Sequence, residues 1–432
     1  MKKCIVVGGG LAGISASVYL KNLGYDIELL EASPKLGGRT YSFFHNKTKT
    51  EVDNGQHLMI GAYEETIALL KIIHAQNIPE YQKYLNVAFL DKYKKKYYLN
   101  AKNKIYPFNL LRAILNYKRL NLKEKISVIK FLLKNFLSKK DLTNKTVSNL
   151  LLENNQSENV IKSLWELIGV GALNTKLEKA SAEIFSILLN RIFFSGNKAS
   201  TFVFTSKPLN KLFVEPVKRY FKENNIKLSL SERVNKIEIH NNKVSIIKTN
   251  RRIITDFDKI IFAVPAFAIK KIVSNQKILP DDILNLEASP IITIHIWTDK
   301  KLFNERVIGF IDSQIDWIFN NVSHYSVIIS AADNLLKKNN NEIIGIVKSE
   351  LNQFLLNFKD VKILNFLIIK EKRAAHLSTP KNEKLRKEIE SKIENLFFAG
   401  DWINTGLPST IESAILSGRL LKKRIEEEYS FT

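Results

Sequence analysis

The sequence predicts an α/β fold that combines a parallel sheet with a second, inserted α+β domain of mixed or antiparallel sheet and helices. Three observations lead to this prediction. A strand, a glycine-rich turn, a helix and another strand follow one another within the first 31 residues, as in a βαβ unit. The apolar run Leu396–Asp401 reads as a further strand that ends in Gly-Asp. The length of 432 residues exceeds one ordinary core, so two folding units are expected.

The first element is a short apolar strand at Cys4–Val7, and its β-branched residues are typical of a buried parallel strand. The turn after it matches G-x-G-x-x-G at Gly8, Gly10 and Gly13. In this motif the first glycine makes the tight turn, and the second lets the backbone approach a pyrophosphate. The third lets the following helix pack closely on the strand.

The next element is a helix predicted from Leu11 to Leu23, with Gly24 as its C-terminal stop. Its first residues, Leu11 and Ala12, offer free N–H groups at the positive end of the helix dipole. A phosphate group would be stabilised there, so both residues are predicted to contact the cofactor together with Gly8, Gly10 and Gly13.

A second strand is predicted at Asp26–Leu30, and Glu31 follows it directly. An acid about 20 residues after the last glycine binds a ribose hydroxyl in dinucleotide-binding domains. A glycine-rich turn of purely structural origin is the alternative, but here the turn lies between strand and helix with the acid in place. The N-terminal segment therefore predicts a Rossmann-like dinucleotide-binding domain.

The run from Ala32 to Thr40, Ala-Ser-Pro-Lys-Leu-Gly-Gly-Arg-Thr, resembles the second glycine motif of the amine oxidase and carotenoid desaturase flavoproteins. The resemblance implies that Gly37, Gly38 and Arg39 wrap the pyrophosphate of FAD. FAD is therefore predicted rather than NAD, and no metal is expected.

The same resemblance extends to the C-terminal part of the chain. It implies that Asp401, after Gly400, hydrogen-bonds the ribityl chain of FAD. A helix predicted to open at Thr410 and Ile411 would point its N-terminus at the flavin ring, where the dipole stabilises negative charge on the reduced flavin.

The middle of the chain completes the predicted cofactor domain. Val234 begins a strand pair and is expected to contact FAD, and Asp258–Pro265 is similar to the strand before the crossover in these flavoproteins. The FAD-binding domain is thus expected in three pieces. We assign residues 1–62, 215–268 and 385–425 to this domain, and residues 63–214 and 269–384 to the substrate-binding domain.

Further segments resemble the hydroxysqualene dehydroxylases, also called squalene-associated FAD-dependent desaturases. They are Asp53–His57 with its extension to Tyr63, Leu164-Trp165 with Ala172–Thr175, Ser289–Trp297, the weaker Glu371–Ala374, and Asp401-Trp402 with Thr405–Pro408 and Thr410–Ser413. The chain departs from the family where Arg386 is followed by lysine instead of proline, and at Gly169-Val170.

This resemblance implies an enzyme that converts hydroxysqualene and reduced FAD into squalene, oxidised FAD and water, on the route to hopanoids or sterols. It places Gly55 and Gln56 beside the cofactor. The predicted substrate-binding residues are Trp165, Asn174, Trp297 and Trp402, although a buried tryptophan is more often a core residue.

Loss of the hydroxyl needs a proton donor. His57 is the first candidate, because histidine titrates near neutral pH and its loop should approach the flavin. Glu412 and Asp53 are the next candidates. The alternative is that His57 and Asp53 only hold the loop by hydrogen bonds.

The net charge of +23 is concentrated in one segment, since residues 91–145 hold 16 Lys or Arg against 3 Asp or Glu. Two apolar stretches with helical spacing, Phe108–Leu115 and Ile126–Leu137, lie among lysines that include Lys139 and Lys140. We predict that helices within residues 105–140 contact an anionic membrane surface. The alternative is packing on the substrate domain with a solvated lysine face. No nucleic-acid module is recognised.

The location expected for the protein is cytoplasmic and peripheral, on the inner face of the cytoplasmic membrane. Cys4 is the single cysteine, so an internal disulfide is excluded, and no apolar run approaches the roughly 20 residues of a spanning helix. Expected partners are a long-chain isoprenoid substrate, a separate flavin reductase or electron donor, and squalene-synthase-like enzymes.

Two other functions stay open. One is a desaturase or oxidase of another polyisoprenoid of the carotenoid type, or of an amine. The other is a non-enzymatic FAD-binding partner within a squalene-synthesising complex. The Asp-Trp and Thr-Gly-Leu-Pro segments argue against the first of these functions.

Overall fold

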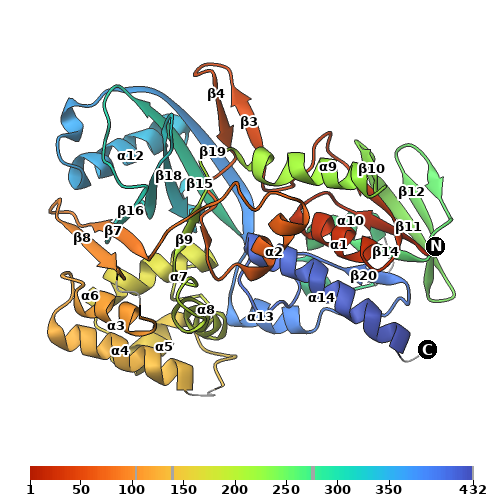
Figure 1. The fold of residues 1–432 in the computed structure, drawn as a ribbon, viewed down its shortest axis with the longest axis horizontal. Coiled ribbons are helices and arrows are strands. Elements are labelled where there is room, and N and C mark those ends of the chain that lie inside the picture. The colour runs from red at the N-terminus through yellow and green to blue at the C-terminus, as the bar shows by residue number, and fades with distance from the viewer. Residues whose placement is uncertain (103–104, 138–140, 274–277, 431–432) are drawn as a thin grey trace.

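A computed structural model describes residues 1–102, 105–137, 141–273 and 278–430 of the chain. Figure 1 shows that the parallel sheet and its helices lie at one end of the molecule, near both termini. A larger sheet and a layer of helices form the other end, and long strands connect the two ends (Figure 1).

The parallel sheet has five strands, in the order β10 (Lys227–Leu230), β2 (Asp26–Glu31), β1 (Lys3–Val7), β14 (Lys259–Phe262) and β20 (Leu396–Phe398). All four neighbouring pairs are parallel, which confirms the predicted sheet. The strands come from three separate stretches of the chain, while the exact domain boundaries stay a prediction.

Helices cover the parallel sheet: α1 (Leu11–Lys21), α9 (Glu215–Glu223), α10 (Ala266–Val273), α11 (Asp281–Leu284), α13 (Pro380–Lys387) and α14 (Ile411–Ser430). The helix predicted to reach Leu23 ends at Lys21, because the last turn tightens and the Gly24 amide bonds the Lys21 carbonyl. α14 packs closely on α1, since a Cβ at Gly418 would lie 2.5 Å from the Ala16 amide nitrogen.

Small antiparallel elements border the parallel sheet. Val234 begins a strand pair, as predicted, and the three strands there are β11 (Val234–His240), β12 (Lys243–Thr249) and β13 (Ile253–Ile254). A hairpin joins β3 (Ser42–His45) to β4 (Thr50–Asp53), and a three-stranded sheet contains β5 (Met59–Ile60), β9 (Phe202–Phe204) and β6 (Glu80–Tyr81). α2 (Glu64–Ile72) follows β5.

The second sheet has seven strands, in the order β19 (Ile363–His376), β15 (Ala288–Thr298), β18 (Tyr325–Ser330), β17 (Trp317–Asn320), β16 (Val307–Phe310), β7 (Asn86–Leu90) and β8 (Lys96–Asn100). Only β16 and β7 run parallel, so the sheet is mixed. Alternate residues of β15, such as Ile292 and Ile294, pack with α12 (Asn340–Phe354) on one face.

The helical layer consists of α3 (Phe108–Leu115), α4 (Leu122–Leu137), α5 (Val147–Glu153), α6 (Glu158–Val160), a π-helical turn (Ile161–Trp165), α7 (Glu166–Leu173) and α8 (Ala182–Phe194). α3 has its predicted bounds. α4 begins four residues before the predicted Ile126, because Asn121 and Glu124 exchange side-chain to backbone bonds as a capping box.

The end of the predicted 105–140 segment, with Lys139 and Lys140, lies outside the described residues. Short helical turns also occur at Asn210–Val214, Asp333–Leu335 and Phe358–Asp360. Within the described ranges, no helix has both the length and the apolar composition that crossing a bilayer requires.

Candidate cofactor and substrate site

The two glycine segments meet at the carboxyl edge of the parallel sheet. The Gly37 amide donates to the Gly9 carbonyl at 2.9 Å, and Gly10 pairs with Gly37 as an isolated bridge. A Cβ on Gly38 would lie 3.0 Å from the Gly10 Cα. This contact of backbone against backbone leaves no room for side chains, so it requires glycine.

The first turn is equally tight beneath α1. A Cβ at Gly13 would stand 1.9 Å from the Gly8 carbonyl oxygen, and Gly8 itself has a φ of +112°. Above Gly10 the space is open, because a Cβ there would meet only the Gly38 Cα at 3.9 Å. The amides of Leu11 and Ala12 begin α1 and have no acceptor within the helix. Free amides beside an open glycine suit a pyrophosphate.

Glu31 lies where β2 ends, on the same edge of the sheet. Its carboxylate accepts from the Gly9 amide at 2.5 Å and from the Ser33 amide at 2.7 Å. These two bonds hold an acceptor beside the glycine turn, which is the position that a ribose hydroxyl requires.

Arg39 and Asp401 join segments that are 362 residues apart in the sequence. The Arg39 guanidinium donates to Asp401 at 2.5 Å and to the Ala374 carbonyl at 2.8 Å. Burial opposes ionisation of Asp401, but the Arg39 charge outweighs it and lowers the pKa of this carboxyl to about 2. Thr410 caps α14 by accepting from the Ser413 amide at 3.2 Å, and Ile411 is its first residue.

These residues fit FAD. The glycine turns and the free amides suit its pyrophosphate, and Glu31 suits its ribose. The Arg39–Asp401 pair offers polar groups to the ribityl chain. Val234 is buried at the start of β11 and so borders the same sheet.

The sequence matches the family described as flavin containing amine oxidoreductase over residues 11–421. The chain belongs to this family. It is an FAD-dependent oxidoreductase, which confirms the cofactor and the enzyme class that the sequence predicts.

Several curated relatives of this chain are named for reactions on isoprenoids. The chain is 26% identical over 417 residues to a hydroxysqualene dehydroxylase from Zymomonas mobilis, covering 96% of each. It is 23% identical to a 15-cis-phytoene desaturase from an Oncidium hybrid cultivar, covering 98% of this chain and 78% of the desaturase. Among solved structures, an oxidoreductase from Methanosarcina mazei superposes with a TM-score of 0.74 and 17% identity, over 98% and 100% of the chains.

In this flavoprotein the loop after β4 carries Gly55, Gln56 and His57. A Cβ on Gly55 would lie 3.3 Å from the Thr293 hydroxyl of β15, so the loop packs against the second sheet. Burial and the charge of Arg39 lower the pKa of His57 to about 4. Its Nε2 is buried and has no partner within the described part of the chain, so this atom is available to a ligand.

Asp53 lies at the start of this loop. Its Oδ1 accepts from the Ser42 hydroxyl at 2.6 Å and from the Leu209 amide at 3.0 Å. Burial raises the pKa of Asp53 to about 6, in spite of these two bonds. Asp53 is therefore an acid that can hold a proton close to neutral pH.

Glu412, unlike Asp53 and His57, lies at the start of a helix and contacts the first turn of α2. Both carboxylate oxygens accept bonds from the first turn of α2, from the Glu65 and Thr66 amides at 2.9 Å each and from the Thr66 hydroxyl at 2.7 Å. Glu412 thus caps α2 from α14, and burial raises its pKa. The catalytic roles of His57, Asp53 and Glu412 stay predictions.

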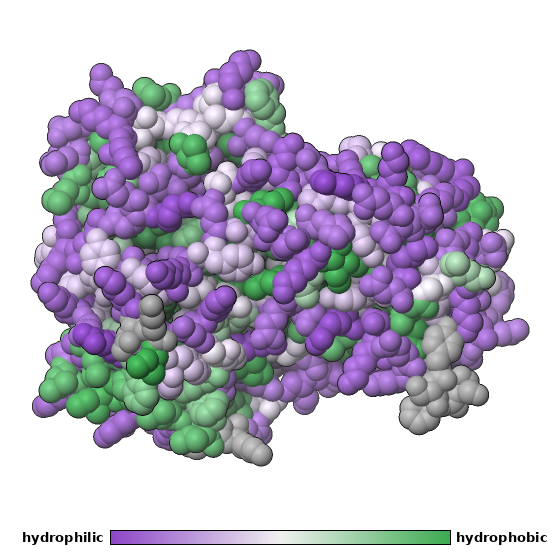
Figure 2. Space-filling model, viewed as in Figure 1, coloured by the Kyte–Doolittle hydropathy of each residue, from purple (hydrophilic) through white to green (hydrophobic). Residues whose placement is uncertain are grey.

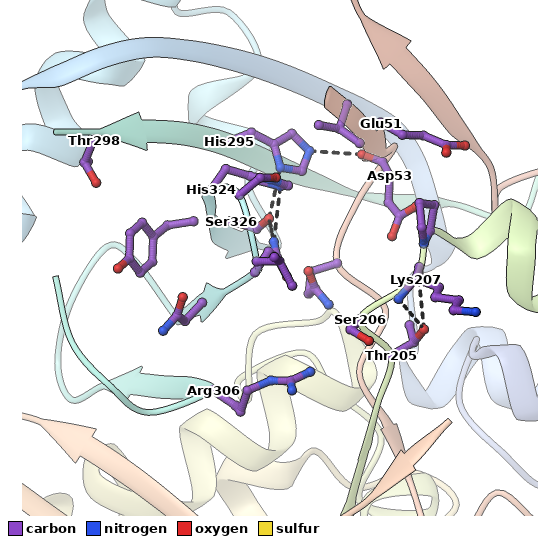
Figure 3. A pocket seen from close by; sticks show the side chains of 18 of the residues that line it. Glu51, Asp53, Thr205, Ser206, Lys207, His295, Thr298, Arg306, His324 and Ser326 are labelled. Atoms are coloured by element: carbon purple, nitrogen blue, oxygen red, sulfur yellow. Dashed lines mark hydrogen bonds between the residues drawn. The ribbon is translucent and has the colours of Figure 1, made fainter. Parts of the chain in front are cut away.

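A cavity of about 600 Å³ lies behind the loop, between Asp53, the edge of the second sheet and residues 205–208 (Figure 3). His295 and His324 face it from β15 and from the turn before β18. His295 donates through Nε2 to the Asp53 carbonyl at 3.0 Å and accepts at Nδ1 from Ser326. Because its lining is largely polar, this cavity does not suit a hydrocarbon chain.

Three of the four predicted substrate residues make firm structural contacts. Trp165 is fully buried and donates to Gln156 at 2.9 Å, and Trp402 donates to the Val264 carbonyl at 3.0 Å. The Asn174 amide bonds the Ser289 carbonyl and accepts from Ala331, so it links α7 to the second sheet.

Trp297 differs from them. It stacks between His45 and His324, with ring centroids 5.2 Å from each, and its Nε1 has no partner among described residues. Contact of these four residues with a substrate stays a prediction.

The sequence reasoning missed Arg386 as a part of the site. Its side chain is 1% exposed, forms an ion pair with Glu383, and donates to the carbonyls of Asp401, Ile403 and Leu407 at 2.6–3.1 Å. It thereby fixes the loop that presents Asp401. Arg386 lies among other cationic residues of α13, such as Lys384 and Lys387, so the sequence carries no local signal that this arginine is buried.

Proposed function

We propose that the protein removes the allylic hydroxyl of hydroxysqualene reductively and releases squalene. The observation that carries this proposal is the similarity to the Zymomonas mobilis hydroxysqualene dehydroxylase through 96% of both chains. The glycine cradle and the Arg39–Asp401 pair support it, because the reaction requires a tightly held flavin.

In the proposed reaction a carbon–oxygen bond breaks and a carbon–hydrogen bond forms. Reduced FAD, when bound, supplies the hydride. The leaving hydroxide takes up one proton and departs as water. One hydroxysqualene and one FADH2 thus give one squalene, one FAD and one water, and a separate reductase or electron donor restores the reduced cofactor.

The chain contributes positioning and a proton. The unpartnered Nε2 of His57 would hydrogen-bond the substrate hydroxyl, and the low pKa keeps this imidazole neutral at pH 7. Asp53, with a pKa of about 6, holds its proton closer to neutral pH than His57 and would supply the proton to the leaving hydroxide.

We also propose that α4 lies on an anionic membrane surface, from which the water-insoluble substrate enters. One face of α4 is buried in the helical layer through Val128, Phe131 and Leu132. On the opposite face an apolar stripe with helical spacing is 42–76% exposed: Leu122, Ile126, Leu133, Phe136 and Leu137. A core-facing helix needs no second apolar stripe.

Lysines flank this stripe. Lys123, Lys130 and Lys134 follow one side of it and Lys125 the other. Figure 2 shows apolar residues gathered over the helical layer, at the lower left of the molecule. An apolar stripe between cationic borders is the pattern of a helix that lies in the plane of a membrane interface.

A second candidate function is desaturation of a carotenoid-type polyisoprenoid. The similarity to the Oncidium phytoene desaturase through 98% of this chain favours it. This reaction runs in the opposite electronic direction, because the substrate loses a hydride to oxidised FAD.

One anaerobic experiment separates the two functions. The purified protein in detergent receives either FADH2 with hydroxysqualene or FAD with phytoene, and lipids are analysed by mass spectrometry. We expect squalene in the first arm and unchanged phytoene in the second. Desaturated product in the second arm, with no squalene in the first, would replace the proposal by the second candidate.

A further inference from the structure

A cationic cavity of about 780 Å³ lies between β8 and α3, away from the flavin site. Five of its ten lining residues are Lys or Arg and none is acidic: Lys95, Lys96, Lys102, Arg112 and Lys118, with Tyr97, Tyr98, Asn100, Asn109 and Asn116 completing the wall. Of these cations, Lys96 bonds Glu305 at 2.7 Å. The charge of the cavity is therefore strongly positive, which suits a phosphate-bearing ligand.

The position of the cavity on α3 relates it to the apolar surface. Asn109, Arg112 and Asn116 follow helical spacing and line the cavity. Phe108 and Leu115, 61% and 41% exposed, form an apolar ridge on the neighbouring face of the same helix. α3 packs beside α4, so this ridge and the exposed apolar stripe of α4 belong to the same layer of helices. When the ridge enters the lipid, the cavity stands at the level of the headgroups.

We propose that this cavity binds the phosphate of an anionic phospholipid headgroup and so orients the enzyme on the bilayer. The proposal rests on the membrane contact of α4 proposed above. The Arg112 guanidinium offers a planar pair of donors to two phosphate oxygens, while Lys102 and Lys118 add charge. Charge complementarity and the adjoining ridge together favour a lipid over a soluble anion.

The test uses the full-length protein and vesicles of phosphatidylcholine, with and without phosphatidylglycerol, in a sedimentation assay. Arg112→Gln, Lys102→Gln and Lys118→Gln are combined in a cavity variant. A matched variant removes the same charge from the α4 surface by Lys123→Gln, Lys130→Gln and Lys134→Gln.

We expect wild type to prefer anionic vesicles, and the α4 variant to lose on the order of 100-fold in affinity for them, about fivefold for each lysine removed from the charged surface. The cavity variant should lose at least tenfold more than the α4 variant, because its three cations also act together on one phosphate group, to which Arg112 can donate two hydrogen bonds. Equal losses in the two variants would overturn the proposal, since diffuse charge would then explain binding.

Three further results of the binding assays bear on the proposal. Equal binding of wild type to neutral and anionic vesicles overturns the headgroup site but leaves membrane contact intact. Binding to neither kind overturns both. Tight binding of inorganic phosphate by wild type, lost in the cavity variant while both proteins bind anionic vesicles equally, assigns the cavity to free phosphate instead. Squalene formation in detergent by the cavity variant should equal that of wild type, so failure here stays separate from failure of the proposed reaction.

Discussion

The cofactor edge of the parallel sheet and the outer surface of α3 and α4 differ in how closely their atoms are packed. At the cofactor edge, backbone meets backbone, and a single added carbon at Gly13 would stand 1.9 Å from a carbonyl oxygen. On α4, apolar side chains such as Leu137, which is 76% exposed, lie largely outside the protein core. The first region therefore fixes a ligand by shape, whereas the second depends on what it contacts outside the chain.

The largest effect should come from Gly13→Ala. The new Cβ clashes with the Gly8 carbonyl, a backbone atom that cannot rotate away, so α1 must move from the glycine turn. We expect a protein that retains no FAD, as measured by flavin absorbance after gel filtration.

Gly345→Ala on α12 is the matched control, because a Cβ there has no atom within 4 Å. It should keep FAD and gain roughly 0.5–1 kcal/mol of stability from its helix position. Normal FAD content in Gly13→Ala would contradict the account of the cradle.

Arg386→Met should cost about 3–5 kcal/mol of unfolding free energy, since it leaves the buried Glu383 carboxylate without its cation. Chemical denaturation measures this loss. FAD should also dissociate more readily, because Arg386 holds the loop that presents Asp401.

Lys387→Met removes a cation from the neighbouring position. Its partner Glu183 lies at 2.7 Å on the surface, so the change should stay below about 1 kcal/mol. Similar losses of unfolding free energy in both variants would mean that the buried ion pair of Arg386 stabilises the fold no more than a surface ion pair does.

Ile126→Ser combined with Leu133→Ser tests the exposed apolar surface of α4. Both side chains are almost half exposed, so the melting temperature should fall by only the few degrees that the loss of their buried halves costs. Vesicle affinity should fall about tenfold or more, because burying the exposed half of each side chain in lipid is worth roughly 1 kcal/mol. Leu356→Ser with Leu364→Ser, on an exposed surface elsewhere, should bind vesicles as wild type does.

The smallest effect concerns pH. If Asp53 supplies the proton, its protonated form is active, and the single-turnover rate should fall as pH rises above about 6, the pKa that burial produces. His57 adds no transition there, because its pKa is lowered to about 4. Asp53→Asn should abolish this pH transition. His57→Gln should lower the rate but leave the pH transition unchanged. A transition that survives in Asp53→Asn would exclude Asp53 as the donor.

The same contrast explains what the sequence could predict. Strand, glycine turn, helix and Glu31 lie within 31 residues, so local rules predicted the parallel sheet and the cradle. Asp401 was assigned by resemblance, yet its pairing with Arg39 across 362 positions has no local signal.

The capping of α2 by Glu412 and the burial of Arg386 depend on how distant helices pack, which periodicity does not contain. Helical spacing located α3 correctly and most of α4. Helical spacing could not show that α4 carries two apolar faces, one buried and one exposed, because the residues of both faces recur with the same period.

The most direct test of the proposed reaction is an anaerobic single turnover of the fully reduced enzyme with excess hydroxysqualene. Flavin absorbance and squalene are followed together. The account predicts that the oxidised flavin spectrum returns and that one squalene forms for each flavin oxidised. A flavin that stays reduced, or that is oxidised without squalene, would contradict it.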